Sequence, residues 1–223
     1  LMTQIYIHGV DSGTIHTMKL PIFGVMNFLA HIYLSFDDPE ITLGNFMADS
    51  IRGRHYLKYP EPMQKGIMLH RAIDTFTDTH PIPRQSSKRL HANYSHYSRV
   101  IIDIYYDHFL ARRWSDYASL PLEHFSHRVY RVLADGQHTF PSRMQRSMTY
   151  LIDHDLLMSY REVGGIAHAL AGIERRLKRP SGLRHAASEL HANYTELLHD
   201  FTEFFPELIA FTRDAEPAAV AIG

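Results

Sequence analysis

Acidic and histidine side chains recur at helical spacing in this 223-residue chain. Asn45 and Asp49 are four residues apart, and Arg52 follows one turn later. A second stripe with the same spacing consists of Gly66, His70, Asp74 and Asp78. Residues three or four apart lie on one face of a helix, so the ends of these side chains come close together. Such a pair can supply two ligands to one divalent ion.

A third group of polar residues interrupts an apolar segment, VIIDIYYDHFLA at 100–111. It comprises Asp103, Asp107 and His108. Buried carboxylates and imidazoles are costly unless they are paired or bind a metal. We therefore interpret this group, together with His31 on the polar stripe of the preceding segment, as candidate ligands. The alternative at each position is structural: a surface ion pair, a hydrogen bond in the core, or the polar edge of a helix.

The composition restricts what such a metal site can contain. The chain has 17 histidines and no cysteine, so its ligands must be imidazoles and carboxylates. An oxygen-rich site favours Mn²⁺, Mg²⁺ or Fe²⁺ over structural zinc. These ions activate water and neutralise charge on phosphoryl oxygens, so phosphoester hydrolysis is the expected chemistry. The sequence has no Walker loop, dinucleotide-binding glycine fingerprint or GxSxG motif.

The charge and hydropathy of the chain argue against two classes of partner. The formal net charge of −1 provides no overall attraction to nucleic acid or to a membrane surface. No stretch approaches twenty uncharged apolar residues, so we expect no membrane span. The absence of cysteine is consistent with a cytoplasmic location.

Helices must position these candidate residues, because the apolar pattern from Met26 onward is helical. Asp38 followed by Pro39 is typical of a helix N-terminus. The expected helices span 26–36, 38–52, 60–77, 84–94, 97–114, 121–133, 142–161, a short segment ending near 178, and 182–213. The fold predicted from this pattern is an all-α, single-domain helical bundle at 26–213 with a tail at 214–223. Residues 1–25 are expected to be a disordered or non-native extension, with a strand at Gln4–Val10 as the alternative.

Four ordered motifs resemble the acyl-carrier-protein phosphodiesterase family. They are MNFLAHIYLS at 26–35, GNFMADSIRG at 44–53, GIMLHRAIDTFTDTHP at 66–81 and DIYYDHFLARRW at 103–114. The resemblance continues through ERRLKRP at 174–180 and DFTEFFPEL at 200–208, and it covers 26–211. It implies a helical fold distantly related to HD-type metal phosphohydrolases. The implied reaction, part of fatty acid and lipid metabolism, is hydrolysis of the phosphodiester between 4′-phosphopantetheine and a serine of acyl carrier protein, with Mn²⁺ as the activating ion.

The resemblance also assigns roles to residues of this chain. The implied metal ligands are Asp49, His70, Asp74, Asp107, His108 and His31. The implied catalytic residues are Asp49, His70, Asp74 and Arg71, with Arg71 or Arg52 stabilising phosphoryl oxygens. In the adjacent pair Asp107-His108 the acid comes first, which departs from the usual HD order.

A protein substrate requires a docking surface as well as a reaction centre. Acyl carrier proteins are acidic, so a basic surface is expected. The densest cationic run consists of Arg175, Arg176, Lys178 and Arg179. The alternative for this run is a solvated helix C-terminus. Two other functions stay open at this point: a nucleotide phosphohydrolase that uses the same metal residues, and a non-catalytic helical module. The sequence does not predict the oligomeric state.

Overall fold

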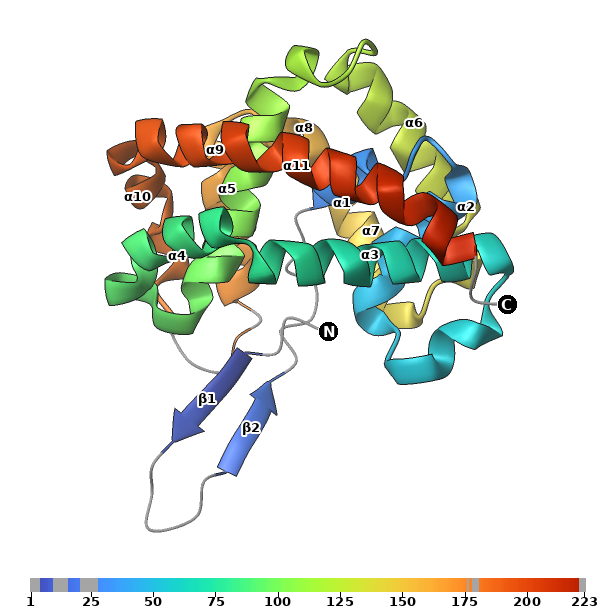
Figure 1. Ribbon diagram of the computed structural model, residues 1–223, viewed down its shortest axis with the longest axis horizontal. Coiled ribbons are helices and arrows are strands. Elements are labelled where there is room, and N and C mark those ends of the chain that lie inside the picture. The colour runs from blue at the N-terminus through green and yellow to red at the C-terminus, as the bar shows by residue number, and fades with distance from the viewer. Residues whose placement is uncertain (1–4, 10–15, 21–27, 176, 178–180, 221–223) are drawn as a thin grey trace.

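The computed structural model describes residues 5–9, 16–20, 28–175, 177 and 181–220 (Figure 1). From residue 28 onward the described chain forms an all-α domain, as the sequence predicts. Its eleven α-helices are α1 (Phe28–Tyr33), α2 (Pro39–Met47), α3 (Glu61–Thr79), α4 (Pro81–Tyr94), α5 (Ser98–Arg112), α6 (Leu122–Asp135), α7 (Ser142–Asp153), α8 (Leu156–Ser159), α9 (Val163–Glu174), α10 (Ala187–Ala192) and α11 (Tyr194–Val220). Short 3-10 turns join several of them, including η1 (Ala48–Ser50) and η2 (Gly53–Lys58).

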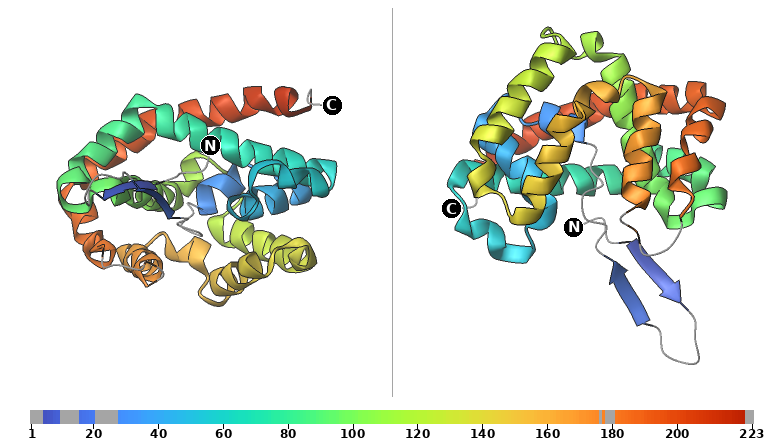
Figure 2. Two further views of the ribbon diagram at one scale, coloured as in Figure 1. Left: turned by 90° about the horizontal axis from the view of Figure 1, so that it is seen from below. Right: turned by 180° about the vertical axis from the view of Figure 1, so that it is seen from behind.

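Helix α5 lies at the centre of the bundle. It contacts α1, α4, α9 and α11, and Tyr105, Phe109 and Leu110 on it are fully buried. The long helices α3 and α11 run side by side across one face of the molecule (Figures 1 and 2). Burial of this apolar surface is the main favourable contribution to the folding free energy of such a bundle. The core therefore holds α1 against α5, and α2 and α3 against α1 and α11.

Most helix boundaries follow the sequence signals. The Asp38 side chain accepts a hydrogen bond from the Ile41 amide at 2.9 Å, which confirms the predicted N-cap before Pro39. The helix expected to reach Arg52 instead ends at Met47 and continues as η1, so Asp49 lies in a 3-10 turn.

Two predicted helices are each divided into two. The 142–161 segment is split at Asp155, whose φ of 43° is left-handed, and the C-terminal segment is split at Asn193 into α10 and α11. The C-terminal helix also extends beyond 213, the predicted domain end.

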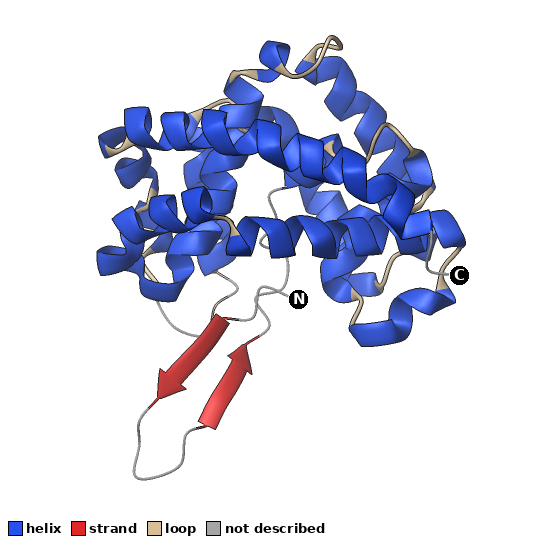
Figure 3. Cartoon of the chain, viewed as in Figure 1, coloured by secondary structure: helices blue, strands red, loops and turns tan. Residues whose placement is uncertain are grey.

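An antiparallel hairpin precedes the helices in the sequence. Strand β1 (Ile5–Gly9) pairs with β2 (His16–Leu20), with Ile5 opposite Leu20 and Gly9 opposite His16. Figure 3 shows the hairpin outside the helical body. β1 falls within the Gln4–Val10 segment for which a strand was the alternative to an unordered extension. The assignment of 1–25 as an addition to the domain stays a prediction.

None of the helices in the described part of the chain combines the length and apolarity required to span a bilayer.

Candidate metal centre

Two glycines allow α2 and α3 to pack very closely. A Cβ atom added at Gly44 would lie 2.1 Å from the Met63 carbonyl oxygen, and one at Gly66 would lie 2.2 Å from the Ile41 carbonyl oxygen. Any side chain at either position would push the two helices apart. The close packing brings Asn45 and Asp49, which follow Gly44, next to His70 and Asp74, which follow Gly66.

Four side chains from α1, η1 and α3 converge at this crossing. Both imidazoles contact the carboxylate of Asp74. His31 Nε2 lies 3.4 Å from Asp74 Oδ1, and His70 Nε2 lies 3.4 Å from Asp74 Oδ2. His70 Nε2 also lies 3.3 Å from Asp49 Oδ1. The two imidazole rings stack with their centroids 4.1 Å apart. Residues 43 positions apart in the sequence, His31 and Asp74, thus share one site.

Asn45, fully buried on α2, determines how both imidazoles are oriented. Its amide nitrogen donates to the His31 carbonyl oxygen at 2.8 Å and to Ser35 Oγ at 3.1 Å. Because a carbonyl oxygen can only accept, the amide nitrogen must face it, and Asn45 Oδ1 must face the rings. That oxygen lies 3.1 Å from His31 Nδ1 and 3.0 Å from His70 Nδ1, so both Nδ1–H groups donate to it. When both rings are neutral, as metal binding requires, their Nε2 atoms have free lone pairs on the side of Asp74.

The donor set fits a divalent cation. One ligand atom each from His31, His70 and Asp74 lies within 4.8 Å of the others, and Asp49 adjoins His70. Imidazoles that ligate metals commonly donate their second N–H to an oxygen acceptor, which is the role of Asn45 here. Imidazole and carboxylate ligands together suit Mn²⁺, Fe²⁺ and related ions. The arrangement can therefore hold one such ion on three or four side chains.

The charges of the cluster depend on one another. Burial lowers the pKa of His31, and the neighbouring His70 lowers it further. Burial also lowers the pKa of His70, but Asp74 and Asp49 outweigh this effect and raise that pKa to about 10. Burial would raise the pKa of Asp74, whereas the two histidines hold it well below its usual range. Without a metal the cluster therefore holds a proton on His70, and a divalent cation competes with that proton for the same atoms.

The cluster is open to solvent on one side. The His31 and His70 side chains are 1% and 3% exposed, whereas those of Asp74 and Asp49 are 16% and 25% exposed. A substrate must therefore approach from the carboxylate side, with the imidazoles behind.

The structure does not bring Asp107 and His108 to this cluster. Asp107 is fully buried and accepts hydrogen bonds from the Leu29 amide at 3.0 Å and the Ala30 amide at 2.9 Å, at the start of α1. Burial raises the pKa of Asp107 to about 8, against the effect of these two bonds. His108 Nδ1 donates to the Tyr160 carbonyl oxygen at 2.7 Å. Both residues have protein partners, and their role as metal ligands stays a prediction.

Arg71 follows His70 on α3 and has partners of its own. Its Nη2 donates to the Ile51 carbonyl oxygen at 2.8 Å, and its guanidinium lies 5.3 Å from the centre of the Tyr56 ring. These contacts fix the guanidinium beside η1 and η2. A role in binding phosphoryl oxygens stays a prediction, for which its other N–H groups are suited.

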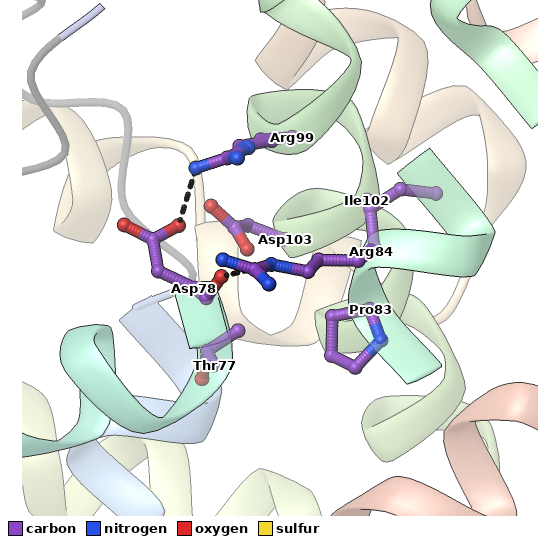
Figure 4. Close-up of a pocket in the computed structure, with 7 residues that line it drawn as sticks. All are labelled: Thr77, Asp78, Pro83, Arg84, Arg99, Ile102 and Asp103. Atoms are coloured by element: carbon purple, nitrogen blue, oxygen red, sulfur yellow. Dashed lines mark hydrogen bonds and ion pairs between the residues drawn. The ribbon is translucent and has the colours of Figure 1, made fainter. Parts of the chain in front are cut away.

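A small pocket lies one turn beyond Asp74, between α3, α4 and α5 (Figure 4). Asp78 and Asp103 face it together with Arg84 and Arg99, and Arg99 Nη1 lies 3.3 Å from Asp78 Oδ1. Burial, with the negative charges of Asp74 and Asp78, raises the pKa of Asp103 well above its usual value. The space that a water molecule can enter in this pocket is about 20 Å³, and the pocket is partly open to solvent.

The sequence names Asn45 only as a member of a candidate pair with Asp49, and it assigns no role to Ser35. Ser35 lies four residues after His31, and Asn45 lies four residues before Asp49, so each shares a face of its predicted helix with a candidate ligand. Spacing alone cannot distinguish a residue that orients a ligand from the ligand itself.

Comparison with known proteins identifies the same family by a sequence model and by individual relatives. The sequence model of the family described as acyl carrier protein phosphodiesterase matches residues 26–208. A protein of that name from Yersinia pestis is 33% identical over 187 residues, covering 82% of this chain and 96% of the relative. Its namesake from Escherichia coli O157:H7 is 32% identical over 190 residues, covering 83% of this chain and 96% of the relative. No solved structure matches the chain.

Proposed function

Because the chain belongs to the acyl carrier protein phosphodiesterase family, we propose that it hydrolyses the phosphodiester joining 4′-phosphopantetheine to a serine of acyl carrier protein. In this reaction the oxygen of a water molecule forms a bond to phosphorus, and the bond from phosphorus to the serine oxygen breaks. The serine oxygen takes up a proton, which gives apo-carrier and free 4′-phosphopantetheine. The proposal accounts for a cluster of acids and imidazoles at a site open to solvent.

The observation that carries the proposal is the convergence of His31, His70 and Asp74 behind the partly exposed Asp49. The three would hold a divalent ion, for which we propose Mn²⁺, with Mg²⁺ or Fe²⁺ as alternatives. When bound, such an ion activates water and neutralises charge on the phosphoryl oxygens.

Asp49 and Arg71 have the remaining roles in this proposal. The Asp49 carboxylate is more exposed than that of Asp74, and it contacts His70 on the solvent side of the cluster. It can therefore act as a further ligand of the ion or accept a proton from water. Arg71 contacts Ile51, Tyr56 and Met68, and we assign its remaining N–H groups to the phosphoryl oxygens.

The proposed binding surface at Arg175, Arg176, Lys178 and Arg179 remains a separate expectation. Arg175 is exposed at the end of α9. Arg176, Lys178 and Arg179 lie outside the described residues.

Intact-mass spectrometry of the carrier tests the proposal. Holo-carrier incubated with the protein and Mn²⁺ should lose the mass of the phosphopantetheine group, and EDTA should prevent the loss. A nucleotide incubated in parallel should stay intact. An unchanged holo-carrier together with nucleotide turnover would instead select a nucleotide phosphohydrolase, and no turnover of either substrate would favour a non-catalytic module.

A further inference from the structure

A short basic segment lies directly after Asp49 in the sequence. Residues 52–58 read RGRHYLK, and no acidic residue occurs between Asp49 and Glu61. The side chains of Arg54, His55 and Lys58 are exposed, and no ion pair to the described part of the chain engages Arg54 or Lys58. Leu57 between them is 48% exposed, the most exposed large apolar side chain among the described residues. The segment therefore presents three basic side chains and one apolar side chain to solvent.

The basic segment is fixed against the helix that carries the site. Arg71 on α3 donates to the Ile51 carbonyl oxygen and packs its guanidinium on Tyr56. Gln64, also on α3, donates to the Tyr59 carbonyl oxygen at 2.8 Å. The segment η2 is therefore anchored at both ends, and it projects from the body of the molecule beside the N-terminal end of α3 (Figure 1). Its backbone is therefore held in place, so binding would have to order only the exposed side chains.

This surface adjoins the open side of the cluster. Asp49 and Arg52 are three residues apart, which places their backbones within roughly 11 Å of each other even in an extended chain. A macromolecule resting on η2 would therefore present a neighbouring side chain to the carboxylate edge formed by Asp49 and Asp74.

We propose that residues 52–58 form the surface on which the acidic carrier protein docks, an inference that rests on the proposed function. The whole chain has a net charge of −1, so its overall charge cannot attract an acidic partner. A local group of cations does so, because complementary charges steer encounter and fix the register of the complex. Leu57, which is exposed between these cations, adds an apolar contact to this interface.

The double charge reversal Arg54→Glu/Lys58→Glu tests the docking surface. It leaves the cluster, Arg71 and Arg52 unchanged. For holo-carrier, kcat/KM should fall at least tenfold, mainly through KM, and its dependence on NaCl concentration should weaken. Mn²⁺-supported hydrolysis of bis(p-nitrophenyl) phosphate should stay the same. The matched control Arg112→Glu/Arg131→Glu makes the same change in net charge on exposed residues of α5 and α6, outside the 52–58 segment, and should have little effect.

Binding of fluorescently labelled apo-carrier, followed by anisotropy, provides a readout that needs no turnover. The double variant should bind at least tenfold more weakly than the wild type, and Leu57→Ser should weaken binding without changing its salt dependence. If holo-carrier is not cleaved but apo-carrier binding depends on Arg54 and Lys58, the proposed function fails and the docking surface stands. Equal binding by the wild type and the double variant, or no binding by either, overturns the docking surface. Loss of carrier and small-diester hydrolysis to the same extent would also overturn it.

Discussion

The side-chain amide of Asn45 determines which nitrogen of each buried imidazole faces the site. Its nitrogen is held by the His31 carbonyl oxygen and Ser35, and its oxygen therefore accepts from both rings. The sequence places Asn45 four residues before Asp49, on a face that we expected to carry ligands. It could not reveal that Asn45 orients ligands instead, because that role depends on two histidines from other helices.

Replacing this amide should weaken metal binding. Asn45→Leu keeps a similar volume but removes the acceptor of both Nδ1–H groups, so the rings can adopt the other tautomer. We expect Mn²⁺ affinity, measured by isothermal titration calorimetry, to fall about 10- to 100-fold. Ser35→Ala removes only one partner of the Asn45 amide nitrogen and should change the affinity much less. If Asn45→Leu bound Mn²⁺ as tightly as the wild type, the orienting role would be wrong.

At the scale of the element, α5 shows why a polar group in an apolar run is ambiguous. The sequence correctly indicates that Asp103, Asp107 and His108 lie in a core helix and need partners. It does not indicate whether a partner is an ion or the backbone of another helix. Adjacent residues on a helix point about 100° apart, so Asp107 and His108 face different neighbours. Asp107 meets the first amides of α1, the helix that carries His31, and His108 meets Tyr160.

Two substitutions one turn apart on α5 should have opposite effects on stability. Asp107→Asn leaves at least one α1 amide without an acceptor and should lower the free energy of unfolding by about 1–3 kcal/mol. Among the described residues no hydrogen bond reaches the Asp103 carboxyl group. Burial raises its pKa, so its ionised form destabilises the fold at pH values above the pKa of the unfolded chain. Asp103→Asn should therefore keep or increase stability at pH 7. Urea denaturation of both variants measures this difference, and an equal loss in both would contradict it.

At the scale of the whole molecule, the helical pattern and the order of the motifs predicted the fold class and most helix positions. Four of the six predicted metal residues converge: His31, Asp49, His70 and Asp74. The packing that brings them together depends on the contact between Gly44 and Gly66, which are both small but are not marked as partners by any local signal. The breaks at Asp155 and Asn193 were missed for a related reason, since apolar spacing continues across both.

Mn²⁺ binding to the metal-free protein tests the central claim most directly. Electron paramagnetic resonance of free Mn²⁺ in a titration should reveal a single tight site in the wild type. Asp74→Asn should abolish it, because Asp74 contacts both imidazoles. Asp78→Asn, one turn further along α3, should retain it. The account would be contradicted by a wild type that binds no Mn²⁺, or by an Asp74→Asn variant that binds the ion as tightly as the wild type.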